Sequence, residues 1–112
     1  MRCKVNVTII GQEGKDILGF GRGIVMLLEG VEKNGSINQA TKNMGMAYSK
    51  AWKIIKTTEK EMGVKLLDRA EANTSVLTPE ARNLIAIYKE AQEAAAKAAA
   101  EVLEKRAKEL NM

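Results

Sequence analysis

A cluster of basic residues in the middle of the chain offers the clearest chemistry in this sequence. Residues 36–69 contain seven Lys or Arg against three Asp or Glu, whereas residues 1–35 and 70–112 are each within one charge of neutral. Amino and guanidinium groups donate hydrogen bonds to phosphate and to guanine, so a local excess of this kind indicates a surface that binds a polyanion. A solvated helical face can carry the same charge without a partner, so the charge needs a motif beside it.

The composition excludes most enzyme chemistry. The 112 residues include one cysteine and no histidine, which excludes an internal disulfide, a Cys/His zinc site and any catalytic triad that needs an imidazole. The acids and lysines show no spacing that would build an acid–base pair or a metal cage. We therefore expect no catalysis, no metal and no cofactor.

No segment of the sequence is suited to a membrane. A membrane span needs about 18 to 20 apolar residues in a row, and no window approaches that length. The N-terminus also lacks the apolar core of a signal peptide. We predict a cytoplasmic protein with no membrane partner.

The hydrophobic pattern predicts one small domain, mainly α with a minor β component. Residues 2–10 alternate polar and apolar side chains, which predicts a strand with one buried face. Residues 11–16 have the composition of a turn. From Arg22 the apolar residues recur at helical spacing until Asn34-Gly35, which predicts the first helix.

Two further helices with a short turn between them are predicted next. Ser36 and Gln39 form the pattern of a capping box at the start of a short helix that runs to about Met44. Gly45 interrupts the helical pattern, which resumes over residues 47–62 with an apolar stripe on one side. This arrangement is that of a helix-turn-helix. The stripe consists of Ala51, Ile54, Ile55, Thr58 and Met62.

The last third of the chain predicts a hairpin followed by a long helix. Residues 64–69 and 74–77 are short strand-prone runs, and Thr78-Pro79-Glu80 is a strong helix start. Apolar residues of the long helix step by four and three positions, as in helices that pair with one another. Its alanine-rich stretch 93–101 also has the composition of a rigid spacer, which is the alternative. The predicted pairing seam consists of Leu84, Tyr88, Ala91, Ala95, Ala98 and Val102.

This order of elements is that of a winged helix, and residues 36–81 resemble the DNA-binding domain of LysR-type bacterial regulators. An N-terminal strand, the glycine-rich stretch 20–23 and the segment 46–52 (Met-Ala-Tyr-Ser-Lys-Ala-Trp) resemble the molybdate-responsive ModE type more closely. The LysR-type pattern is carried by Gly35-Ser36-Ile37, Ala40, Gly45-Met46, Ala51, Ile55, Glu59, Gly63, Leu66-Leu67, Arg69 and Leu77-Thr78.

The resemblance implies a transcriptional regulator that binds double-stranded DNA as a homodimer. Residues 1–78 would form the winged helix-turn-helix domain, and residues 79–112 its dimerisation helix. Relatives of the ModE type have molybdate-binding domains after this helix, whereas the sequence ends at Met112, so we expect no molybdate site. The wing differs as well, because residues 70–75 replace a glycine-rich loop and include Glu71, which phosphate would repel.

The helix-turn-helix geometry assigns roles to individual side chains, because the second helix lies in the major groove. Ser49, Lys50 and Lys53 are expected at base edges or phosphates, and Trp52 in the core. Tyr48 would contact DNA or pack on the neighbouring helix, and Arg69 would contact phosphate or pair with Asp68 or Glu71. The predicted DNA-binding residues are Ser36, Asn38, Lys42, Tyr48, Ser49, Lys50, Lys53, Lys56, Lys65 and Arg69.

A second hypothesis is a protein-interaction or scaffolding module that keeps the winged-helix fold but no longer binds DNA. The acid in the wing and the nearly neutral last helix motivate it. DNA binding that weakens with salt would distinguish the two, since each phosphate contact releases counterions.

Overall fold

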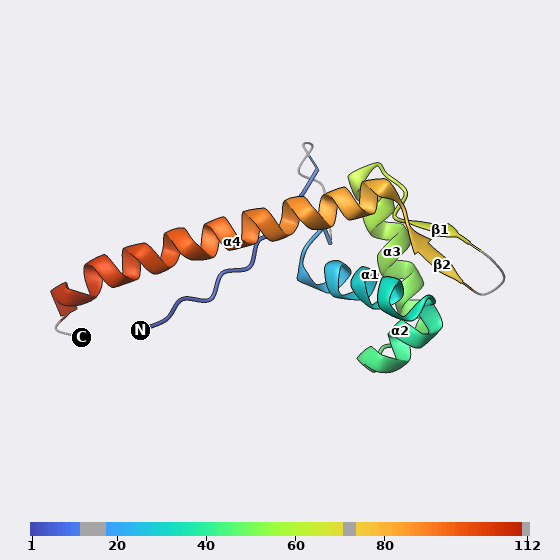
Figure 1. Cartoon of the computed structure of the whole chain (residues 1–112), viewed down its shortest axis with the longest axis horizontal. Helices are drawn as coiled ribbons and strands as arrows, with labels where there is room; N and C mark the ends of the chain where they lie inside the picture. The colour runs from blue at the N-terminus through green and yellow to red at the C-terminus, as the bar shows by residue number, and fades with distance from the viewer. Residues whose placement is uncertain (12–17, 71–73, 111–112) are drawn as a thin grey trace.

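In the residues that the computed structural model describes (1–11, 18–70 and 74–110), short helices and a hairpin pack around the start of one long helix (Figure 1). The mainly helical winged-helix prediction is confirmed. The elements are α1 (Arg22–Asn34), α2 (Ile37–Met44), α3 (Tyr48–Met62), β1 (Leu67–Arg69), β2 (Ser75–Leu77), α4 (Pro79–Ala107) and a final 3₁₀ turn (Lys108–Leu110).

The end of α1 and the start of α2 lie where the sequence supplies capping groups. Gly35 is left-handed (φ 78°) and its N–H donates to the Val31 carbonyl at 2.7 Å, which ends α1. The Ser36 hydroxyl accepts from the N–H of Gln39 at 3.1 Å, as predicted. The reciprocal half of the capping box is wrong, because the Gln39 amide donates to Asn43 one turn further on.

The core lies where α1, α2 and α3 meet the base of the hairpin and the first turns of α4. It is aliphatic apart from Phe20 and Tyr88, which suits a sequence with few aromatic residues. Burial of these side chains removes apolar surface from water and is the main force that holds the helices together. The largest fully buried apolar side chains are Phe20, Leu27, Leu28, Val31, Ile55 and Leu66.

The hairpin is shorter than predicted. Leu67, Asp68 and Arg69 pair antiparallel with Leu77, Val76 and Ser75, respectively. Residues 64–66 were also predicted as strand, but they lie outside the ladder. The N–H of Leu66 and the carbonyl of Lys65 bind side chains, and only the Leu66 carbonyl bonds across the hairpin, to the N–H of Thr78. The predicted wing tip, including Glu71, and the predicted turn at 11–16 fall largely on residues outside the described ranges.

The predicted N-terminal strand is wrong. Residues 1–10 run as an extended segment beside α4 (Figure 1), and a single bridge between Ile9 and Phe20 is their only strand-like pairing with a described residue. The alternation itself is present, because Val5, Val7 and Ile9 are half-buried, although Cys3 is exposed. No second strand among the described residues lies beside the segment, so the alternation comes from a half-buried extended chain and not from a strand of a sheet.

The long helix gives the molecule its shape. The principal extents are 60 × 32 × 22 Å, and α4 projects far beyond the packed helices (Figure 1). Ala81, Ile85 and Tyr88 are its buried residues, all within its first three turns. None of the helices in the described ranges has an apolar stretch that could span a membrane.

One buried polar atom generates a stability prediction. Thr58 is fully buried, and its hydroxyl has no hydrogen-bond partner among the described residues. A buried hydroxyl without a partner costs about 1 to 3 kcal/mol, so Thr58→Val, which keeps the shape, should raise the free energy of unfolding by about 1 kcal/mol. Urea denaturation measures this.

Thr41 supplies the matched control. It is also buried, but its hydroxyl donates to the Asn38 carbonyl at 2.9 Å. Thr41→Val should therefore bring no gain in stability. An equal gain in both variants would contradict the explanation, since the unpartnered hydroxyl would then not be the cause.

Candidate nucleic-acid interface

α2 and α3 are joined by a tight turn that fixes the angle between them. Gly45 is left-handed (φ 66°), a conformation that side chains disfavour, and its N–H returns to carbonyls at the end of α2. The N–H of Met46 donates to the Thr41 carbonyl at 2.9 Å. α3 then begins at Tyr48, so the helix-turn-helix is present as predicted.

α3 has one buried side and one exposed side. Ala51, Ile55 and Thr58 are fully buried and hold the helix against the core. Ser49, Lys50 and Lys53 are exposed on the other side. Neither lysine forms an ion pair with any residue in the described ranges. These two ammonium groups are therefore available to a ligand without first breaking a contact.

A groove of about 760 Å³ lies between α3, the start of α2 and the hairpin. Five of the ten predicted DNA-binding residues line it, namely Ser36, Asn38, Tyr48, Lys56 and Arg69. The structure does not bring the other five into the groove. Ser49, Lys50 and Lys53 lie on the exposed side of α3, Lys42 on α2, and Lys65 just before β1.

An aromatic pair forms one wall of the groove. The rings of Tyr48 and Trp52 meet edge to face, with centroids 6.4 Å apart and planes at 83°. The Lys56 ammonium lies 5.4 Å from the centroid of the Trp52 ring, within the range of a cation–π contact. Tyr48 thus packs on its own helix and stays half exposed. Trp52, predicted as core, both packs against the core and lines the groove.

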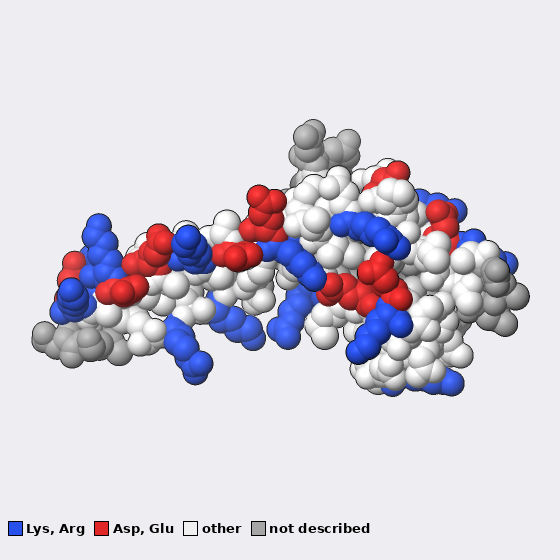
Figure 2. Space-filling view, in the orientation of Figure 1, with Lys and Arg blue, Asp and Glu red and all other residues white. Residues whose placement is uncertain are grey.

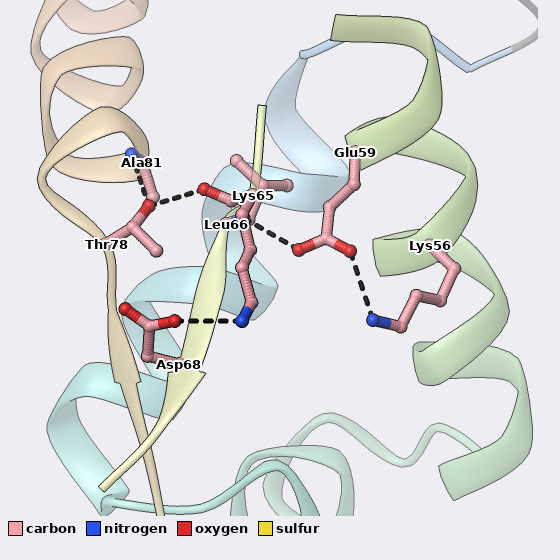
Figure 3. Close-up of polar contacts among 7 residues, drawn as sticks. All are labelled: Lys56, Glu59, Lys65, Leu66, Asp68, Thr78 and Ala81. Carbon is pink, nitrogen blue, oxygen red and sulfur yellow. Dashed lines mark hydrogen bonds and ion pairs between the residues drawn. The ribbon is translucent and has the colours of Figure 1, made fainter. Parts of the chain in front are cut away.

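Two side chains hold the backbone just before β1 (Figure 3). One Glu59 carboxylate oxygen, from α3, accepts the N–H of Leu66 at 2.7 Å. The Thr78 hydroxyl donates to the Lys65 carbonyl at 2.6 Å, while it accepts the N–H of Ala81 and so caps α4. The dipeptide 65–66 is therefore held from α3 on one side and from α4 on the other, which fixes the hairpin relative to α3.

Carboxylates compete for some of the basic groups at this surface. Lys56 pairs with Glu59 at 3.3 Å, and Lys65 pairs with Asp68 at 3.1 Å (Figure 3). The predicted alternative that Asp68 pairs with Arg69 is wrong, because Asp68 pairs with Lys65 and no described acid lies within ion-pair distance of Arg69. The Lys65–Asp68 pair is exposed on both sides, and such pairs contribute at most about 1 kcal/mol, so phosphate could displace Asp68.

Sequence reasoning missed several residues that line the groove. Glu59, Asp68 and Ser75 line it from three different elements, α3, β1 and β2. Glu59 carried no signal of this role in the sequence, because its bond to the N–H of Leu66 depends on the tertiary fold. No three acidic or cysteine side chains in the described ranges are grouped in a way that could hold a metal ion.

Other residues of the same chain bury part of the predicted pairing seam on α4. Tyr88 is only 7% exposed and belongs to the core, so its assignment to a partner surface is wrong. Leu84, Ala91 and Ala95 are half-buried, whereas Ala98 and Val102 are exposed. Acidic and basic side chains alternate along α4 on the face seen in Figure 2, so no single-sign patch opposes pairing there.

The fold and the site together define a winged helix-turn-helix of the DNA-binding class. The family described as "Bacterial regulatory helix-turn-helix protein, lysR family" matches residues 25–82, more than half of the chain. The protein belongs to this family.

The comparison with solved structures supports the fold. ArgP from Mycobacterium tuberculosis superimposes with a TM-score of 0.54 at 21% sequence identity. The superposition covers 72% of this chain and 30% of ArgP, so this chain corresponds to less than a third of that protein. No curated protein sequence matches the chain significantly.

The contacts of Glu59 generate a prediction. Its side chain is 13% exposed and holds Leu66 through a charge-assisted hydrogen bond. Loss of such a bond costs about 1.5 to 3 kcal/mol, so Glu59→Ala should lower the free energy of unfolding by that amount in urea. Glu59→Gln keeps an oxygen acceptor and should lose about half as much or less. Equal losses in the two variants would show that the charge, and not the bond to Leu66, is what matters.

Proposed function

We propose that this chain binds double-stranded DNA in a sequence-specific manner and acts as a transcriptional regulator, with α3 in the major groove. The observation that carries the proposal is the division of α3 into a buried side and an exposed side, whose Lys50 and Lys53 form no ion pair with a described residue. Membership of the lysR family of regulatory proteins supports it. We expect it to act in the cytoplasm, without catalysis and without a cofactor.

The predicted residues take three roles in this proposal. Ser49, Lys50 and Lys53 face the base edges, where lysine can donate to guanine O6 and N7. Residues at the start of α2 and along the groove, with Lys42 near the end of α2 and Lys65 just before β1, contact phosphate and set the register of the protein on DNA. This second set comprises Ser36, Asn38, Lys42, Lys56, Lys65 and Arg69, with Tyr48 at a phosphate or a thymine methyl group.

Salt titration tests the role of the α3 lysines. The logarithm of the affinity should fall with the logarithm of the salt concentration, with a slope of about −0.9 for each phosphate contacted. Lys50→Ala and Lys53→Ala should each weaken binding by about 1 to 3 kcal/mol if they reach a base, or flatten the slope by about one contact if they reach phosphate. Fluorescence anisotropy with a duplex selected from random sequences measures both quantities.

Lys97→Ala is the matched control, since Lys97 is exposed on α4 and the substitution removes the same charge. It should leave affinity and slope nearly unchanged. If the Lys97 variant loses as much affinity as the α3 variants, the binding is a general charge effect. If no duplex binds even at low salt, the DNA-binding proposal fails.

We also propose that the protein acts as a homodimer. A single module with a few contacts binds DNA weakly, with non-specific dissociation constants of about 10⁻⁴ to 10⁻⁶ M. Two copies paired through α4 would place their recognition helices in successive major grooves, with half-sites about 10 base pairs, or a multiple of that, apart. In the single chain Ala98 and Val102 of the seam are exposed, whereas Leu84, Ala91 and Ala95 are half-buried and would contribute only part of their surface.

A charge placed on the seam tests this dimer. Val102 is 59% exposed, so Val102→Glu should not disturb the single chain. It would put an acid against the partner helix and should weaken dimerisation at least tenfold in sedimentation velocity. Ala100→Glu, exposed on the opposite side of α4, should have little effect. A strictly monomeric wild-type protein at tens of micromolar would refute the homodimer.

Resemblance to the ModE type stays a prediction that rests on residues 46–52. The N-terminal strand, one of its marks, is an extended segment instead. One observation favours the scaffolding alternative, because Glu59 and Asp68 place negative charge in the groove. Absence of duplex binding in the titration above, with the fold intact, would favour that alternative.

A further inference from the structure

The extended N-terminal segment is bound to its own chain along one edge. The Gln92 side chain, on α4, donates to the Val5 carbonyl and accepts the N–H of Val7 at 2.8 Å. Ile9 exchanges two backbone hydrogen bonds with Phe20, at 2.7 and 2.8 Å. In an extended chain, alternate residues direct their backbone groups to the same edge. The backbone groups of residues 5, 7 and 9 therefore face α4 and Phe20. The side-chain amide of Gln92 forms the hydrogen bonds that a neighbouring strand would form.

The opposite edge of this segment is open. Lys4, Asn6 and Thr8 direct their N–H and C=O groups there, and these groups form no hydrogen bond with any described residue. All three residues are exposed. Open edges of β-branched extended chain are templates on which another strand can pair.

We propose that this edge pairs antiparallel with the same edge of a second copy, in a register centred on Asn6. The inference rests on the proposed homodimer and adds a second contact to it. In this register Asn6 faces Asn6 of the partner subunit across a pair of reciprocal hydrogen bonds, and Lys4 faces Thr8 of the partner subunit. Each copy thereby satisfies the three backbone positions left open in the single chain.

The sequence of the segment is self-complementary in this register. Lys4 faces Thr8 of the partner subunit, so no like charges are opposite each other. The two Lys4 side chains lie about 13 Å apart along the pair of strands. That distance exceeds the Debye length of about 8 Å at physiological salt. Val5 faces Val7 of the partner subunit, a β-branched pair of the kind that stabilises strand pairing.

The position of the segment connects it to the proposed α4 seam. Gln92, which holds the segment, is the neighbour of Ala91 and lies one turn before Ala95, and both alanines belong to that seam. A ribbon of five residues alone is too small for a stable dimer, since specific interfaces bury about 1,200 to 2,000 Å². The strand pairing and the helix seam would therefore form one continuous interface.

Cysteine cross-linking of the full chain tests the register. In a Cys3→Ser background, Asn6→Cys places the two sulfur-bearing residues opposite each other, with Cα atoms about 5.5 Å apart, within disulfide range. Lys4→Cys is the matched control, because its two copies would lie about 13 Å apart and cannot be bridged. Under mild oxidation, the Asn6 variant should form covalent dimers on non-reducing gels at least tenfold faster than the Lys4 variant.

Sedimentation velocity on the same proteins under reducing conditions separates the proposed strand pairing from the proposed α4 homodimer. If the chain is dimeric but both variants cross-link at the same rate, or neither does, the strand pairing is overturned and the α4 homodimer stands. If the reduced chain is monomeric throughout, both fail. DNA binding is measured independently by anisotropy and does not depend on either outcome.

Discussion

The position of the hairpin relative to α3 depends on how one dipeptide is held. Lys65 and Leu66 lie outside the strand ladder, and their backbone groups are bound by Glu59 from α3 and Thr78 from α4. Buried backbone groups need such partners, since an unpaired one costs as much as a lost hydrogen bond. Because Thr78 also caps α4, the same residue sets where the long helix begins. These two side chains thus help to position the groove, the wing and α4, together with the backbone bonds from Thr78 to Leu66 and from Ser75 to Gly35.

The candidate interface contains both lysines without an ion-pair partner among the described residues and lysines that pair with an acid. Lys50 and Lys53 project from α3 without an ion-pair partner among the described residues, whereas Lys56 and Lys65 are each paired with an acid three residues further along the chain. Glu59 serves both sides, because one carboxylate oxygen holds Leu66 and the other neutralises Lys56. A ligand that displaced this acid from Lys56 would leave the hairpin anchored. The surface can therefore change ion partners without losing its shape.

Local patterns predicted most of the fold, and long-range contacts account for what they missed. Helical spacing and the glycines at 35, 45 and 63 gave α1, α2 and α3 nearly to the residue, and Thr78-Pro79 gave the start of α4. Period-two alternation cannot tell a strand from a half-buried extended chain, so residues 2–10 were assigned wrongly. The exposed lysines followed from the apolar stripe of α3, but the groove did not, because Ser36, Trp52 and Ser75 meet only through the tertiary fold.

The account depends on Lys50 and Lys53 meeting DNA rather than solvent. Lysine acylation footprinting by mass spectrometry, with and without a selected duplex at low salt, tests that point on the unmodified sequence. We expect the amines of Lys50 and Lys53 to be strongly protected by the duplex, and those of Lys97 and Lys105 on α4 to react equally in both states. Full reactivity of Lys50 and Lys53 in the bound state would contradict the account.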